Sequence, residues 1–417
     1  MKNYKKTVQI IFLILAAEIT YALPFVLLRI FRPTFLEAFN ITNKDIGICY
    51  TLYGITAVIS YFFGGLITDK FKLKYLMSIA LFLTSLGGFA WVCYPYLTTL
   101  YVLYIYWGFT TIMLFWSPLI KATRLWGGKE SQILGFGLLE GGRGIVAALI
   151  GTIGVFILTT ITSEENSSSL LLQSAMNKVY LITSALVMLV AFLILLLPNF
   201  GEHSKIKTTN SHKYNIIKAL KYPIVWILMI IVLTSYIGFR IADIFTQYSS
   251  EVYGYNSRKS AELGTFISYI RPIICLLVIF FAKNSNPSKW LIIGFSIMSL
   301  GSFLFVFNID IFNFSLLLPL VCSLIGVYTT RVLYFTVLEE AKIPITMTGT
   351  VVGIVSVIGF SPDIFLGPIE GYYLDEVGGV LAYQYLFIFF LASSLIGLFA
   401  SILYNNSLNS KNKLLST

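Results

Sequence analysis

Five arginines lie inside stretches of sequence that are apolar enough to be buried in lipid: Arg29, Arg143, Arg240, Arg271 and Arg331. A charged side chain near the centre of a bilayer is costly, so it is usually retained where it serves a function. Guanidinium groups also bind oxyanions through paired N–H donors. The arginines therefore predict a path or pocket for an anion inside a membrane.

Four carboxylates share these apolar segments and are candidates for proton coupling: Glu18, Glu140, Asp243 and Asp363. Glu140 precedes Arg143 by three residues, and Asp243 follows Arg240 by three, a spacing at which helical neighbours can pair. Two interpretations stay open. Either the pairs are structural, or the carboxylate competes with the anion for its arginine, so that binding is tied to protonation.

The composition indicates an integral membrane protein. The 417 residues are 57% hydrophobic and 12% charged, and the mean hydropathy is +0.83, whereas soluble domains carry roughly 25% charged residues. Hydropathy predicts twelve transmembrane helices, near residues 8–31, 45–68, 74–94, 97–122, 131–160, 178–197, 222–249, 261–282, 288–308, 313–337, 346–369 and 380–404. The first apolar run is too long for a signal peptide and lacks a small-residue cleavage pattern.

The spans divide into two halves of six. A polar stretch at 199–221 is the expected cytoplasmic linker between bundles at 1–198 and 222–417. Most lysines and arginines outside the spans fall on the side of the termini, which the positive-inside rule places in the cytoplasm. The opposite side carries Arg32, Lys44, Lys178, Arg258 and Lys259. Six plus six helices is a layout of transporters that rock two bundles around a site at the midplane.

Other chemistries find little support in the sequence. His203 and His212 both lie in the polar linker, and the four cysteines lie in apolar segments without metal or disulfide spacing. No nucleotide-binding loop or set of nucleophile and base is present. We therefore expect no enzyme activity, cofactor, metal or nucleic acid, and we expect a gradient to supply the energy.

The segment between the second and third spans resembles the signature loop of the major facilitator superfamily. It reads Gly64-Gly65-Leu66-Ile67-Thr68-Asp69-Lys70-Phe71-Lys72-Leu73-Lys74, with Lys72 where the family usually has glycine. Together with twelve spans, the resemblance implies an all-α membrane protein of two pseudo-symmetric six-helix bundles, with Asp69 and Lys70 in a structural or gating role.

A narrower resemblance connects the chain to bacterial organophosphate:phosphate antiporters and sugar-phosphate permeases. It rests on residues 116–118, 236–240, 349–353 and 371–375. That family is thought to hold phosphate with arginines of helices 1 and 7 and a histidine of helix 5. Arg240 falls on the helix 7 arginine, whereas Phe25 stands at the helix 1 position with Arg29 one turn later. Gly142 replaces the histidine, and Arg143 is adjacent.

The resemblance also implies roles for the remaining arginines. The eighth and eleventh helices are neighbours in the superfamily, so a bridge between Arg271 and Asp363 is expected to be structural or gating. Arg331 is expected near the cytoplasmic end of the tenth span, with Glu339 and Glu340 as partners.

These observations predict a monomeric secondary active transporter of a small organic anion, of the phosphorylated or acidic sugar or polyol class. It would work in the cytoplasmic membrane by anion antiport, with inorganic phosphate as a counter-substrate, or by proton symport. The expected substrate-binding residues are Arg29, Arg143, Arg240, Tyr21 and Tyr236. A non-transporting sensor of a phosphosugar and a proton-driven exporter of hydrophobic compounds are the alternatives.

Overall fold

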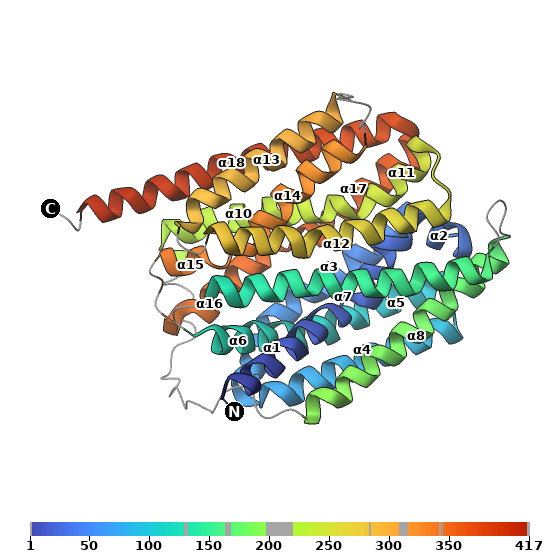
Figure 1. Cartoon of the computed structure of the whole chain (residues 1–417), viewed down its shortest axis with the longest axis horizontal. Coiled ribbons are helices and arrows are strands. Elements are labelled where there is room, and N and C mark those ends of the chain that lie inside the picture. The colour runs from blue at the N-terminus through green and yellow to red at the C-terminus, as the bar shows by residue number, and fades with distance from the viewer. Residues whose placement is uncertain are drawn as a thin grey trace.

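The computed structural model describes residues 2–128, 132–162, 168–196, 220–282, 285–307, 316–341, 343 and 345–414, and no β-strand occurs in these ranges. The helices run along the long axis of the molecule (Figure 1). α1 begins and α18 ends at the same end of the bundle, to the left in this view. We call this the terminal end, and the opposite one the distal end. Residues 199–219 of the expected linker lie outside the described residues.

The first half contains six membrane-length segments, two of them built from several helices. They are α1 (Lys2–Ile19) with η1 (Ala22–Val26) and α2 (Leu27–Phe39); α3 (Asn43–Lys70); α4 (Leu73–Cys93); α5 (Leu97–Gly108) with η2 (Phe109–Trp116) and α6 (Ser117–Gly127); α7 (Gln132–Ile161); and α8 (Ser169–Leu196).

The second half repeats this arrangement. Its segments are α10 (Pro223–Ile241) with η3 (Ala242–Ile244) and α11 (Phe245–Tyr253); α12 (Ser257–Ala282); α13 (Pro287–Val306); α14 (Leu317–Leu333) with α15 (Val337–Glu340); α16 (Ile345–Gly359) with α17 (Pro362–Tyr372) and η4 (Tyr373–Val377); and α18 (Gly379–Leu414). In Figure 1 these yellow to red helices lie mostly above the blue to green helices of the first half.

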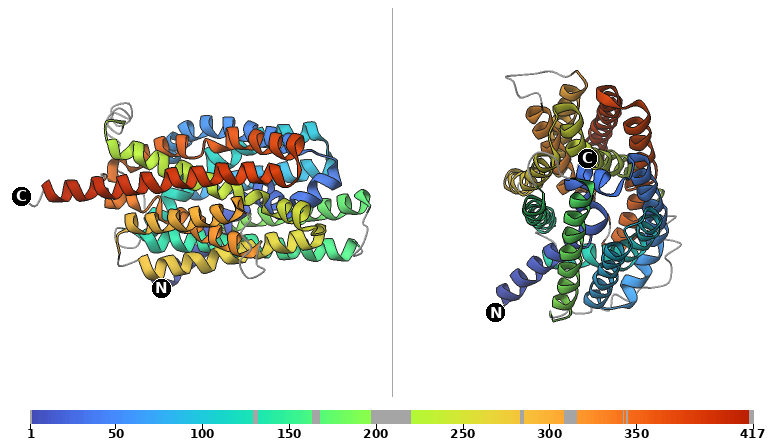
Figure 2. Two further views of the ribbon diagram at one scale, coloured as in Figure 1. Left: turned by 90° about the horizontal axis from the view of Figure 1, so that it is seen from above. Right: turned by 90° about the vertical axis from the view of Figure 1, so that its right-hand side faces the viewer.

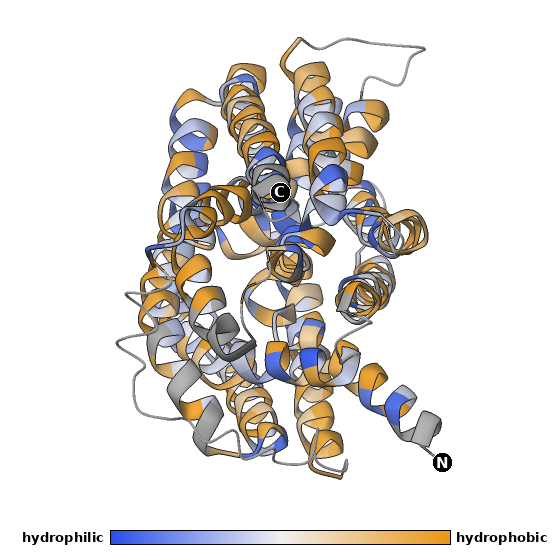
Figure 3. Ribbon diagram, turned by 90° about the vertical axis from the view of Figure 1, so that its left-hand side faces the viewer, coloured by the Kyte–Doolittle hydropathy of each residue, from blue (hydrophilic) through white to orange (hydrophobic). Residues whose placement is uncertain are grey.

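The hydropathy of the helices fits a membrane. Among the described residues, nine helical segments are long and apolar enough to cross a bilayer, and the pair 6–19 and 22–39, bent by 45°, makes a tenth. The 28-residue α3 and the shorter apolar α14 complete the twelve expected spans. Hydrophobic ribbon, interrupted by shorter hydrophilic stretches, is present on the outer helices when the molecule is viewed from the terminal end (Figure 3). Large apolar side chains such as Phe156, Phe280 and Phe399 are exposed, as expected where lipid is the solvent.

Three spans differ from the sequence prediction. The first continues to Phe39 because the chain bends at Thr20–Tyr21, and the second half of the span then carries Arg32 into the interior rather than into a loop. The sixth begins at Ser169, nine residues early, since polar side chains are tolerated at its distal end. The eleventh is broken between Gly359 and Pro362, where proline cannot continue the hydrogen-bond ladder.

The most extensive contacts between the two halves are those of α7 with α12 and of α3 with α17. The blue to green half and the yellow to red half lie against each other in both views of Figure 2. Glycine makes both contacts possible. A Cβ added to Gly47 would lie 2.5 Å from the carbonyl oxygen of Gly367, and one added to Gly144 would lie 2.6 Å from Cδ of Pro272. Such close backbone approach is how small residues let membrane helices pack.

We predict that Gly47→Val lowers the thermal unfolding midpoint in detergent, because overpacking a close contact costs about 1–3 kcal/mol. Gly353→Ala is the matched control, since a Cβ there meets nothing within 4 Å and alanine favours the helix. A midpoint for Gly47→Val equal to that of the wild type would contradict the close α3–α17 contact.

Candidate functional site

Nine charged side chains from six spans converge where the two halves meet, and every one of them is at most 8% exposed. They are Arg29, Arg143, Arg240, Arg271 and Arg331 with Glu18, Glu140, Asp243 and Asp363. Charges at this depth are stable only when they are paired and hydrogen-bonded. The pairing therefore shows how the site is built.

Two glutamates organise the larger group. Arg143 donates through Nε to Glu18 at 2.6 Å and through Nη1 to Glu140 at 2.9 Å. Arg271 donates to the same two carboxylates, at 3.2 Å and 2.5 Å respectively. Arg331 lies 3.5 Å from Glu140 through its Nε. Helices α1, α7, α12 and α14 are thus held by one cluster that crosses between the halves.

Two aspartates organise the smaller group. Asp243 accepts from both Arg29 and Arg240, one from each half of the chain. Nε of Arg240 also lies 3.1 Å from Asp363, to which the Tyr236 hydroxyl donates at 3.0 Å. Arg29 and Arg240 are thus each hydrogen-bonded to a carboxylate inside the protein, although Nε and Nη2 of Arg240 are buried without a hydrogen-bond partner.

Phe239 lies between the two groups. The guanidinium carbons of Arg29, Arg331 and Arg271 are 4.2, 3.8 and 5.9 Å from its ring centroid. Cations are attracted to the face of an aromatic ring. Phe239 therefore lets arginines that repel one another share a small volume.

The cluster carries an excess of one positive charge, since five arginines and four carboxylates sum to +5 − 4 = +1 when all are ionised. The pairing assigns this excess to Arg331. Its Nε and Nη1 are buried without a hydrogen-bond partner, and among the described residues no carboxylate accepts a hydrogen bond from it. Arg331 is therefore the arginine best suited to receive an added oxyanion.

Three of these charged side chains and five aromatic neighbours form a closed ring of contacts, which we call the central ring. In order they are Glu140, Arg331, Phe239, Tyr236, Phe360, Trp116, Tyr21 and Arg143. Each member contacts the next one in this order. The distances between neighbours, measured between charged groups or ring centroids, are 3.5, 3.8, 6.1, 4.8, 5.7, 6.3 and 5.6 Å. Arg143 closes the ring, because its Nη1 lies 2.9 Å from Glu140.

Most members of the central ring keep more exposure than the charged side chains beside it, with the exception of Arg29, which is 8% exposed. Tyr236 is partly exposed, and the other seven members keep 5–9% exposure in the middle of the molecule. Glu18, Arg240, Asp243 and Arg271 keep only 0–2%. Each ring member thus keeps some atoms accessible to water, whereas these four charged side chains are almost completely enclosed.

Two sequence predictions about pairing are confirmed, and one is wrong. The Glu140–Arg143 and Arg240–Asp243 pairs form as predicted. The expected Arg271–Asp363 bridge does not, because Arg271 is held by the two glutamates while Asp363 faces Arg240.

One of the two expected partners of Arg331 is replaced, and the other is not tested. Glu340 accepts from Ser288 instead, and the side chain of Glu339 lies outside the described residues. The side chains of Asp69 and Lys70 lie outside them as well. Sequence reasoning missed the roles of Phe239, Trp116 and Phe360, although the first two lie in the short segments that carry the family resemblance.

A second group of charged residues, of which Arg32 and Glu370 are buried, joins the two halves at the distal end, and we call it the distal latch. Arg32 donates to Oδ1 of Asn43 at 3.1 and 3.0 Å, and lies 3.6 Å from Glu370. Asp375 accepts from the Asn43 side chain at 2.9 Å and from the backbone N–H of Lys44 at 2.6 Å. α2 and the start of α3 are thereby fastened to α17 and η4.

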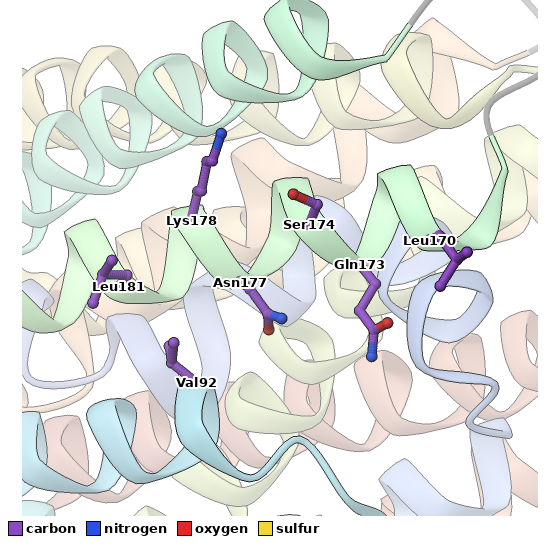
Figure 4. Close-up of a pocket in the computed structure, with 7 residues that line it drawn as sticks. All are labelled: Val92, Leu170, Gln173, Ser174, Asn177, Lys178 and Leu181. Carbon is purple, nitrogen blue, oxygen red and sulfur yellow. The ribbon is translucent and has the colours of Figure 1, made fainter.

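A surface groove of about 350 Å³ lies apart from this site, between the distal ends of α4 and α8 (Figure 4). Lys178 is the one charged residue that lines it, beside Gln173, Ser174 and Asn177. The groove contains none of the nine charged residues of the central cluster.

The family model for the Major Facilitator Superfamily matches residues 11–365 of this chain. The chain belongs to the Major Facilitator Superfamily. It is 25% identical over 395 residues to "Inner membrane protein YqcE" of Escherichia coli, covering 92% of this chain and 90% of that protein. It is also 25% identical over 362 residues to "Inner membrane protein YihN" of the same organism, covering 84% of each. Together with the apolar spans, these relatives indicate an integral inner membrane protein.

Solved members of the Major Facilitator Superfamily share the fold. A D-xylose-proton symporter superposes with a TM-score of 0.71 at 14% identity, covering 96% of each chain. The nucleoside transporter NupG gives 0.65 at 14% identity, covering 96% of this chain and 98% of that one. FucP in the outward conformation gives a TM-score of 0.66 at 17% identity, covering 95% of this chain and 98% of that one. At these identities the likeness shows the fold alone.

We predict that Arg271→Gln destabilises the protein far more than Arg331→Gln. The first substitution leaves two buried glutamates short of a donor, a change that costs about 3–5 kcal/mol. The second removes the same charge without breaking a hydrogen bond. Thermal unfolding of the two variants in one detergent measures the difference, and equal losses would contradict the assignment of the excess charge to Arg331.

Proposed function

We propose that the protein is a secondary active transporter that moves a small organic anion of single negative charge by alternating access. The observation that carries this proposal is the buried excess of one positive charge at Arg331, in a ring of side chains that keep some exposure to water. One negative charge on the cargo neutralises the cluster, whereas an uncharged cargo leaves a buried arginine uncompensated.

Arg143 and Arg331 would hold the anion, with Glu140 between them. Glu140 is bonded to Arg143 and Arg271 and lies beside Arg331, so an oxyanion at the ring competes with it for donors. The side chain of Glu140 is 10% exposed, more than that of Glu18 or Asp243. A cargo with two negative charges would exceed the available positive charge, and protonation of Glu140 would then restore the balance. Cargo charge therefore decides between anion exchange and proton symport.

A phosphate ester held as in the organophosphate:phosphate antiporters is the less favoured cargo. Arg29 and Arg240, which would hold it, are both bonded to Asp243. The position of the family's histidine is Gly142, where a Cβ would lie 2.5 Å from the side chain of Ile14. A phosphate would have to displace Asp243 from both arginines, whereas Arg331 donates no hydrogen bond to a carboxylate among the described residues.

Transport requires the two ends of the molecule to open in turn. The distal latch joins α2 and α3 to α17 and η4, so it must break before cargo reaches the ring from the distal side. The excess of lysines and arginines at the terminal side supports a cytoplasmic terminal end. The distal latch would then be the periplasmic gate.

We predict that locking the distal latch abolishes transport. Asn43→Cys with Asp375→Cys, in a protein whose four native cysteines are replaced, is bridged by a short reducible dithiol reagent. Uptake into proteoliposomes should stop on bridging and return on reduction, while each single-cysteine variant is unaffected. Uptake that continues in the bridged protein would show that the distal end need not open.

We predict that Arg331→Gln lowers uptake of labelled monoanions by roughly 30-fold or more, the loss expected for a charge-assisted hydrogen-bonded contact. The panel contains lactate, gluconate and glucuronate. Lys178→Gln is the matched control because it removes a positive charge at the surface groove. Full uptake by Arg331→Gln, or binding of these anions without any flux, would overturn the proposal.

A further inference from the structure

The central ring has two chemically different sides. Glu140, Arg331 and Arg143 form a charged arc. The remaining five members form an aromatic arc, drawn from four spans: Phe239, Tyr236, Phe360, Trp116 and Tyr21. An anion of two or three atoms would use only the charged arc. The aromatic arc therefore indicates that a larger part of the cargo lies beside it.

The aromatic arc is lined by ring faces and edges at mixed angles. Tyr236 and Trp116 meet Phe360 nearly edge-on, at 82° and 87°, and Tyr21 meets Trp116 at 77°. Tyr61 also stacks on Phe360, with the two ring planes 20° apart. Ligand pockets are typically lined by such aromatic surface with a few placed polar groups.

Trp116 supplies the placed polar group. Its Nε1–H is buried without a hydrogen-bond partner while its side chain retains accessible surface. Buried indole N–H groups usually have a partner, as Trp107 does in the carbonyl oxygen of Thr84 at 3.2 Å. Trp91 also lacks one, but the whole residue is 0% exposed, whereas other atoms of Trp116 leave that residue 8% exposed.

We propose that the aromatic arc is a subsite for a pyranose ring, so that the cargo is a sugar acid bearing one carboxylate. This inference rests on the proposed function. The carboxylate would meet Arg331 and Arg143, a ring hydroxyl would accept from Nε1 of Trp116, and the apolar C–H face of the sugar would pack against Phe360 and Tyr236. The C–H groups carry slight positive charge, which complements the negative face of an aromatic ring.

Other cargo classes satisfy fewer of these groups. A cyclohexane or benzene carboxylate would fill the arc but leave the Trp116 donor unpaired, and an unpaired buried donor is penalised. A neutral hexose would pair that donor but leave Arg331 uncompensated. A short carboxylate such as lactate would leave the aromatic arc unused.

The test is a binding series on the purified full-length protein, read by isothermal titration. The probes are glucuronate, galacturonate, cyclohexanecarboxylate and glucose. At least one of the two uronates should bind about tenfold or more tighter than cyclohexanecarboxylate, the size of one added hydrogen bond, and glucose should bind weakest. If cyclohexanecarboxylate binds as tightly as both uronates, the sugar subsite is wrong while the anion proposal stands. If glucose binds as tightly as the uronates, the anion proposal itself is wrong.

The matched variants are Trp116→Phe and Trp91→Phe, which each replace an indole with an unpartnered N–H by a smaller ring. Trp116→Phe should weaken uronate binding about tenfold and leave cyclohexanecarboxylate binding unchanged. Trp91→Phe should change neither. Equal effects of the two substitutions on uronate binding would overturn the role of Trp116. The wild-type series stands on its own if either variant fails to fold.

Discussion

The structure depends on burying one more arginine than carboxylate between its two halves. Ionised groups are expensive to remove from water, and an ion pair repays that cost only with good geometry. Four arginines obtain that geometry from Glu18, Glu140, Asp243 and Asp363. Arg331 is left beside Phe239, with only a 3.5 Å approach to Glu140. Six spans are held in place by this pairing, so a change of charge at the ring acts on both halves at once.

That coupling suits a protein whose halves must move. The contacts outside the charged cluster are of two kinds. Glycine pairs such as Gly47 with Gly367 give close packing without side chains that interlock. The distal latch adds a few hydrogen bonds at one end. Helices joined in this way separate at modest cost, whereas the charged cluster is expensive to disturb unless a ligand compensates it. Binding at the ring and movement of the halves are therefore expected to be linked.

The sequence predicted the fold well, because the signal for a membrane span is local. It also predicted the arginines and carboxylates of the site, since an ionised residue in an apolar run stands out by its cost. The pairs three residues apart, such as Glu140 with Arg143, followed from helix geometry. Partners on different helices did not follow, and the Arg271–Asp363 bridge was wrong for that reason. Arg32 was assigned to a loop because its burial depends on a bend that hydropathy does not register.

The aromatic members of the ring were the hardest to predict. In a chain with 34 phenylalanines and 26 tyrosines, nothing in the local sequence distinguishes Phe360 from a side chain that faces lipid. The most direct test of the charge excess is the number of protons taken up per bound anion, measured by titration calorimetry in buffers of different ionisation enthalpy. A monoanion should bind without proton uptake, and a dianion should bind with uptake of one proton. Uptake of a proton with the monoanion would contradict the excess of one positive charge.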